Sequence, residues 1–209
     1  MKRLWIFLLM VVFGLSLSAQ TSLGEAQSQQ VIAMLTEAAT SMQTMQCRFV
    51  QSKTMAMLAV PSVSEGTMHF VTPDRLRWEY LSPYPFALIV NGEHIVKVTD
   101  GKSEVLEGNA GRMYQGIVGI IMGSASGQKL FDSTVFDVVI FDDEAFWKAE
   151  MTPKRRDMKR MFSQLVFRFD KKTNVISRVQ LVEASGDVTS IHFEDIRINQ
   201  AVDESVFAY

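Results

Sequence analysis

Residues 65–98 read EGTMHFVTPDRLRWEYLSPYPFALIVNGEHIVKV, and this stretch indicates the fold class. It holds three segments of strand length with alternating polarity, separated by turn residues. In residues 75–80 charged and large apolar side chains alternate, so a strand here places Leu76, Trp78 and Tyr80 on one face. The opposite face is expected in water. The pattern favours a sheet with one apolar face, and an ordinary half-buried strand of a β-sandwich also fits it.

The same kind of pattern continues on both sides of this stretch. β-Branched and aromatic residues prevail from Cys47 onward, and strand-like segments return after Phe131. The later strands are expected near residues 134–141, 144–152, 161–169, 175–183 and 188–198. Turns are expected at residues 72–74, 82–85, 91–92, 100–101, 142–144, 154–157, 171–174 and 185–187.

Two segments have helical spacing instead. Residues 25–45 predict an amphipathic helix, and Ser22 and Glu25 have the spacing of a capping box. Residues 109–131 predict a short, mostly buried helix that contains several glycines. One long curved sheet with two helical insertions predicts a mainly β (α+β) fold. The expected form is an incomplete antiparallel β-barrel whose mouth or concave face the helices cover as a lid, and a plain α+β sandwich stays open as an alternative.

The first nineteen residues have the composition of a secretory signal peptide. Lys2 and Arg3 precede an apolar run over residues 4–17, and cleavage is expected after Ala19. The run is shorter than the roughly 20 residues that a membrane-spanning helix needs. Residues 20–209 are then expected to form a single soluble domain in the periplasm.

Charge and cysteine content limit the possible functions. Without residues 1–19 the chain has 19 basic and 23 acidic residues, a formal charge of −4, which argues against nucleic acid as a partner. Cys47 is the only cysteine, so an internal disulfide is impossible. A small buried apolar side chain is its expected role, and a reactive thiol is the alternative.

Catalytic and metal-binding patterns are missing from the sequence. The three histidines, His69, His94 and His192, do not occur in an HExxH, HxH or cysteine-paired context. Because no nucleophile and base can be placed together, we expect no enzyme and no cofactor, and a hydrolase is disfavoured.

A cluster of five cations is concentrated in a short segment of this acidic chain. It suggests docking to an acidic protein surface or to anionic head groups, and a solvated hairpin tip is the alternative. The cluster consists of Lys154, Arg155, Arg156, Lys159 and Arg160.

Several short motifs, in this order, resemble the LolA family of periplasmic outer-membrane lipoprotein carriers. The resemblance covers nearly all of residues 20–209. After an N-terminal amphipathic helix it rests on Phe49-Val50-Gln51, Glu65-Gly66-Thr67, Pro73, Arg77-Trp78-Glu79-Tyr80, Pro83, Asn91-Gly92, Met151-Thr152-Pro153-Lys154 and the segment from Val202-Asp203 to Phe207.

The resemblance implies a monomeric carrier with a half-barrel and a helical lid. Its cargo would be lipoproteins that an ATP-driven complex releases from the inner membrane, held by their acyl chains, and the outer-membrane acceptor is not identified. By position in the family, the inward-facing residues would be Phe49, Met68, Phe70, Leu76, Trp78, Tyr80 and Ile89. The lid residues would be Leu35, Met42, Ile117 and Ile121.

Two departures from the family pattern and one alternative function are also visible. Well-studied members have a basic residue before the proline that hydrogen-bonds to the lid, whereas Thr72 precedes Pro73 here. The sequence also lacks a longer tail after Tyr209 that many members carry. The alternative is a binding or sensor module with the same half-barrel that carries another lipid or hydrophobic ligand.

Overall fold

The computed structural model describes residues 21–57, 60–92, 94–107 and 130–209, in which eleven strands form one antiparallel sheet. The predicted signal peptide and nearly all of the predicted helix over residues 109–131 lie outside these residues. The strands are β1 (Thr44–Thr54), β2 (Ser62–Val71), β3 (Arg75–Ser82), β4 (Phe86–Asn91), β5 (His94–Thr99), β6 (Lys102–Val105), β7 (Phe136–Asp143), β8 (Phe146–Pro153), β9 (Phe162–Asp170), β10 (Ile176–Glu183) and β11 (Val188–Ile198).

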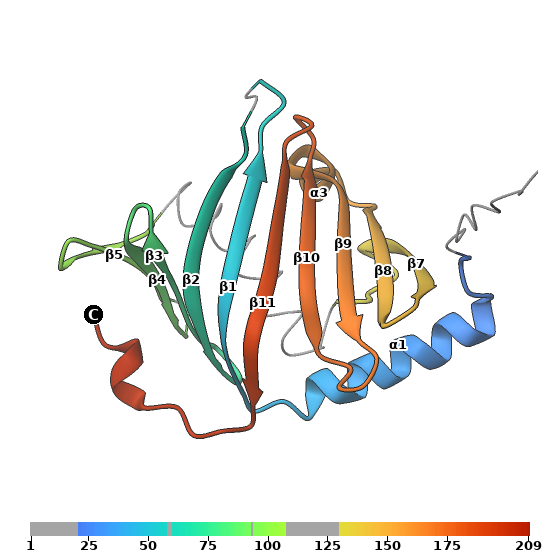
Figure 1. Ribbon diagram of the computed structural model, residues 1–209, viewed down its shortest axis with the longest axis horizontal. Coiled ribbons are helices and arrows are strands. Elements are labelled where there is room, and N and C mark those ends of the chain that lie inside the picture. Colours follow the sequence, from blue (N-terminus) through green and yellow to red (C-terminus); the bar gives the residue numbers. More distant parts are fainter. Residues whose placement is uncertain (1–20, 58–59, 93, 108–129) are drawn as a thin grey trace, which may run out of the picture.

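The sheet is open and curved, as Figure 1 shows. Its order is β6-β5-β4-β3-β2-β1-β11-β10-β9-β8-β7, so the first and last strands pair at its centre. The two edge strands, β6 and β7, come from the middle of the sequence and do not pair with each other. This architecture confirms the predicted fold class, a curved antiparallel sheet that stops short of a closed barrel.

The helix α1 (Glu25–Thr40) runs from the β7 edge to the start of β1 (Figure 1). Ahead of it, the Leu23 amide donates to the Ile140 carbonyl at 2.8 Å, which ties the entry of the helix to β7. Its buried side chains Val31 and Leu35 belong to the same apolar cluster as the sheet. No helix among the described residues is long and apolar enough to cross a membrane.

The N-terminal helix differs from its prediction at both ends. Gly24 occupies the N-cap without a side-chain hydrogen bond, and Ser22 forms a bridge with Phe141, so the predicted capping box is wrong. The helix also ends at Thr40 rather than at residue 45. The Asn199 side chain causes this early end, because its amide donates to the Ser41 carbonyl at 3.3 Å and its oxygen accepts the Gln43 amide at 2.7 Å.

The turn expected at residues 154–157 is also wrong, since the chain forms the short helix α3 (Arg156–Met161) there. Met158 and Met161 are half-buried against the core, and this contact favours a helical turn over a two-strand hairpin tip. By contrast, the turns predicted at residues 91–92 and 100–101 are confirmed. Gly92 and Gly101 have φ values of 61° and 72°, a conformation that glycine adopts without strain.

The two faces of the sheet differ in polarity because side chains alternate along each strand. On β3, Leu76 and Trp78 are buried while Arg75 and Arg77 point to the other face. The buried cluster on the first side draws residues from all the strands except β6 and from α1, and we call this side the concave face. The other side is the convex face, where Ala87 and Ile89 form a small cluster with Phe207 of the 3₁₀ helix η1 (Glu204–Phe207).

Candidate functional site on the concave face

Five aromatic rings form a continuous row on the concave face, contributed by β11, β3, β1 and β4. Phe49 is stacked on Trp78 with centroids 4.2 Å apart and meets Tyr80 edge-on at 5.3 Å. Tyr80 is stacked on Phe86 at 4.6 Å, and Phe193 meets Trp78 edge-on at 6.1 Å. We call these residues the aromatic row. Such ring pairs are stabilising beyond the apolar area they bury, so the row gives this half of the face a defined shape.

Gly66 makes the position of the Phe49 ring possible. The two residues are cross-strand partners in β1 and β2, and a Cβ at residue 66 would lie 2.4 Å from Cζ of Phe49. It would also lie 2.0 Å from the Glu79 carbonyl oxygen on β3. A side chain at this position would therefore push the ring or the strand away, and only glycine leaves the necessary space.

The concave face becomes polar beyond the aromatic row. Next along β1 and β2 come the partners Gln51 and Ser64, and the Tyr80 hydroxyl donates to Gln51 Oε1 at 2.9 Å. Lys53 follows on the same face of β1 and forms an ion pair with Glu183 at 2.8 Å. The apolar surface thus has a polar margin at the end of the sheet where the β1–β2 connection lies (Figure 1).

The second half of the concave face is formed by β7 to β10, and α1 packs against its apolar cluster, in contact with β7. Ile140, Met151, Leu165 and Phe167 are fully buried there. They share one apolar cluster with Val31 and Leu35 of α1 and with Trp78 and Phe49 of the aromatic row. A ligand that entered this surface would have to displace side chains that now cover it.

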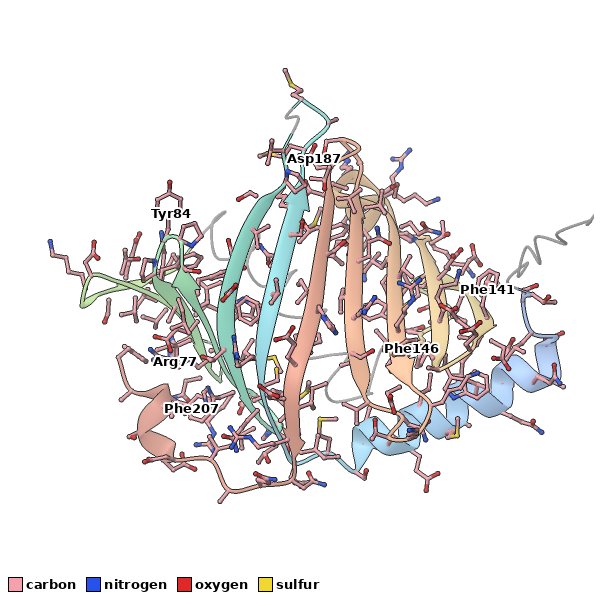
Figure 2. All side chains as sticks on the ribbon, in the orientation of Figure 1. Arg77, Tyr84, Phe141, Phe146, Asp187 and Phe207 are labelled. Atoms are coloured by element: carbon pink, nitrogen blue, oxygen red, sulfur yellow. The ribbon has the colours of Figure 1, made fainter. Side chains whose placement is uncertain are left out.

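Six of the seven side chains predicted to face inward lie on the concave face, namely Phe49, Met68, Phe70, Leu76, Trp78 and Tyr80. Ile89 does not, and that prediction is wrong. It pairs with Arg77 across β3 and β4, so it shares the convex face with that arginine and packs against Phe207. Figure 2 shows Arg77 and Phe207 near each other beside the C-terminal segment.

The sequence reasoning missed several concave residues. Leu88 and Val90 are the β4 partners of Trp78 and Leu76, and both are buried in the concave cluster. Phe86 and Phe193 belong to the aromatic row and were also not predicted. The usable signal was register: once Trp78 is assigned inward, its cross-strand partner must face inward too.

The predicted lid residues have different outcomes. Leu35 lies on α1 and is 1% exposed, facing the concave cluster. Met42 is buried in the same cluster but lies after the end of the helix, in the connection to β1. Ile117 and Ile121 are outside the described residues. Of the four predicted lid residues, the structure places Leu35 and Met42 against the concave cluster, and only Leu35 lies on a helix.

A match to a protein-family model assigns the chain to a family. The model of the outer membrane lipoprotein carrier protein LolA matches residues 40–209. The chain belongs to the LolA family. An outer-membrane lipoprotein carrier protein of Pseudomonas paraeruginosa is 24% identical over 203 residues, which cover 97% of this chain and 94% of the relative. One from Methylobacillus flagellatus is 25% identical over 146 residues, covering 69% and 67%.

The fold of this LolA family member is also similar to that of a solved structure, MucB. The TM-score is 0.54 at 15% sequence identity, over 89% of this chain and 64% of MucB. The chain thus spans less than two thirds of the length of MucB, and the likeness concerns the fold alone. The names of the two sequence relatives describe carriers rather than enzymes.

Thr72, the residue before Pro73, links the β2–β3 turn to another part of the chain. Its hydroxyl donates to the carbonyl oxygen of Gln43 at 3.3 Å, and its amide donates to the same oxygen at 2.9 Å. The hydroxyl also lies 3.3 Å from Gln43 Oε1. These bonds join the β2–β3 turn to the connection that follows α1.

Cys47 is buried on the concave side of β1 and has no disulfide partner, as expected for the only cysteine. Burial raises the pKa of its thiol to about 12, so the reactive thiolate is suppressed. Within the described residues no group of three or more histidine, cysteine, aspartate or glutamate side chains is arranged to hold a metal ion.

The convex face carries charged groups instead. Arg77 donates two hydrogen bonds of 2.9 Å to the Glu79 carboxylate, and these hold the pKa of Glu79 below its ordinary value of 4.5. A depression of about 440 Å³ on this face is lined by charged and polar side chains, among them Arg168, Arg178 and His192, together with valines such as Val50 and Val166. Its lining differs chemically from the apolar concave face, so it is a poor candidate for acyl chains.

Proposed function

We propose that this protein is a periplasmic carrier that holds the acyl chains of lipoproteins on its concave face. It receives them after an ATP-driven complex extracts them from the inner membrane, and it delivers them to an acceptor at the outer membrane. The observation that carries the proposal is the continuous apolar surface to which every strand except β6 contributes. Membership of the LolA family supports the same cargo class.

The aromatic row and the α1-covered half suit flexible chains better than a rigid ligand. Acyl chains have no hydrogen-bonding groups along their length, and the buried faces of β1, β2 and β3 offer mostly carbon and sulfur atoms to them. The polar margin at Gln51 and Ser64 would be suited to the glyceryl and peptide parts of a lipoprotein. The carrier would therefore hold the tails inside and leave the protein part outside.

The energetics require the concave face to be covered when it is empty. Burying a methylene is favourable by about 0.8 kcal/mol, so three chains of about fifteen methylenes would gain roughly 36 kcal/mol. Noncovalent affinities saturate near about −20 kcal/mol, and a carrier that bound this tightly would not release its cargo. To bind, the acyl chains have to displace Val31 and Leu35 of α1 from the apolar cluster of the concave face, and this cost offsets part of the free energy gained by burying them. On this proposal α1 acts as an internal competitor for the cargo surface.

Mass spectrometry of protein purified from the periplasm without detergent tests the proposal. We expect triacylated polypeptides to co-purify. A free glycolipid, an isoprenoid or another small hydrophobic ligand in their place would contradict the lipoprotein assignment and support the alternative binding module.

A pair of variants on β3 tests which face holds the cargo. Tyr80→Asp places a carboxylate within the aromatic row, whereas Leu81→Asp places one on the neighbouring residue, which is 54% exposed. We expect Tyr80→Asp to lose bound lipoprotein and Leu81→Asp to retain it, with far-UV circular dichroism confirming that both fold. Equal loading of the two variants would contradict the assignment of the concave face.

A further inference from the structure

Exposed apolar and cationic side chains gather at the end of the sheet where the concave face becomes polar. Met57 and Val60 lie in the β1–β2 connection and are 95% and 75% exposed. Arg156, Lys159 and Arg160 lie on α3 and are exposed as well. We call these five residues the docking rim. We infer that the docking rim binds the surface of a membrane that contains anionic lipids.

The rim is a single surface because hydrogen bonds join the elements that carry it. The Ala56 amide, next to Met57, donates to Asp187 Oδ1 in the β10–β11 connection at 3.1 Å. The Ala184 amide of that connection donates in turn to the Met161 carbonyl at the end of α3 at 3.0 Å. Figure 1 shows α3 and both connections at one end of the molecule, and Figure 2 labels Asp187 there.

Cations outnumber carboxylates at this end, even with Asp187 of the β10–β11 connection counted, although the chain as a whole is acidic. Three basic side chains nearby have carboxylate partners: Lys53 pairs with Glu183, Lys154 with Asp137, and Arg155 with Asp157. Among the described residues, no ion pair engages the three rim cations.

α3 presents these cations outward in a fixed orientation. Met158 and Met161 are half-buried against the core, so this side of the short helix is directed inward. Arg156, Lys159 and Arg160 are exposed, and so is Asp157, which pairs with Arg155. Long cationic side chains can reach lipid phosphates while their carbon stems cover apolar surface.

A lipid surface fits this arrangement better than a folded protein partner. A stable protein interface buries roughly 800 Å² on each partner, far more than two apolar side chains on a hairpin connection can supply. Apolar side chains beside lysine and arginine are the composition by which peripheral proteins insert at the head-group boundary. A fluid lipid surface can also contact side chains that project from two different elements, here the β1–β2 connection and α3.

Docking at this end would bring the polar margin of the concave face toward the membrane. The inference nevertheless stands on the rim alone and does not need the concave face to carry a lipoprotein. Binding can therefore be measured on the cargo-free protein lacking residues 1–19.

The experiment is co-sedimentation with vesicles of phosphatidylglycerol and phosphatidylethanolamine, compared with vesicles of phosphatidylcholine. We expect binding to the anionic vesicles that weakens with added salt and little binding to the neutral ones. The triple variant Arg156→Gln, Lys159→Gln, Arg160→Gln should bind roughly a hundredfold more weakly, because each cation near an anionic surface contributes about fivefold. The double variant Met57→Ser, Val60→Ser should bind about tenfold more weakly.

The matched control is the double variant Lys102→Gln, Val105→Ser on β6, which also combines an exposed cation with an exposed valine. It should bind within about twofold of the unchanged protein. The inference is overturned if the unchanged protein does not bind anionic vesicles, if the rim variants bind as well as the control, or if the rim binds only a solubilised acidic protein. Lipoprotein loading of the same variants, measured by mass spectrometry, reports on the proposed function separately.

Discussion

The variant Gly66→Ala should destabilise the protein through a single added methyl group. That carbon would lie 2.0 Å from the backbone oxygen of Glu79 and 2.4 Å from Cζ of Phe49, well inside normal contact distance. Both contacts have to be relieved, so strand β2 moves away from β3 and the Phe49 ring leaves its stack on Trp78. These changes disturb the centre of the aromatic row.

Overpacking at residue 66 and the lost stacking of Phe49 together determine how far the free energy of unfolding falls. Overpacking a well-packed site costs about 1–3 kcal/mol, and loss of an aromatic pair adds about 0.5–1.5 kcal/mol. We therefore expect the free energy of unfolding to fall by about 1.5–4.5 kcal/mol. For a chain of this size, this lowers the melting temperature by about 3–18 °C.

Urea denaturation at fixed pH, followed by tryptophan fluorescence and far-UV circular dichroism, measures this loss. Gly24→Ala is the matched control, because a Cβ at Gly24 meets no atom within 4 Å and the change should cost no more than about 1 kcal/mol at this helix cap. Equal stability of the two variants would refute the close packing of Phe49 over Gly66. A double-mutant cycle with Phe49→Leu should give a coupling of at least about 0.5 kcal/mol.

Three further predictions follow from other contacts. Thr72→Val removes the donor to Gln43 and should cost about 0.5–1.5 kcal/mol in urea denaturation, while an unchanged midpoint would contradict a role for this link. Because Arg77 lowers the folded pKa of Glu79, their pair stabilises the protein above the ordinary pKa of 4.5, and this contribution is lost as the pH falls through the folded pKa. In the variant Glu79→Gln, the free energy of unfolding should depend less on pH below 4.5. An unaltered pH dependence would contradict a stabilising role of the Arg77–Glu79 pair. Cys47 should resist a thiol reagent until the chain unfolds, and rapid labelling of the native protein would contradict its burial.

Alternation along single strands made much of the concave face predictable. Trp78 and Leu76 are separated by charged residues in a strict period of two, and this pattern fixes both the face and the strand. The turns at Gly92 and Gly101 were equally readable, because glycine follows a residue typical of turns at both positions.

Features that depend on distant contacts or on continuous apolar runs could not be predicted. In β4 the run from Ala87 to Val90 is buried on both faces, so the sequence alone does not tell that Ile89 points outward to Phe207. The end of α1 depends on Asn199, which is 156 residues from Gln43 along the chain. No local periodicity contains that information.

Quenching of Trp78 fluorescence by a brominated acyl chain tests the central claim most directly. Trp78 is 3% exposed and stacked in the aromatic row, and in the variant Trp147→Phe lacking residues 1–19 it is the single tryptophan. We predict that a lipoprotein with brominated acyl chains quenches its emission at saturation, while iodide in solution does not. Full emission in a complex whose bound lipoprotein is confirmed by mass spectrometry would contradict the account, because the acyl chains would then lie away from the concave face.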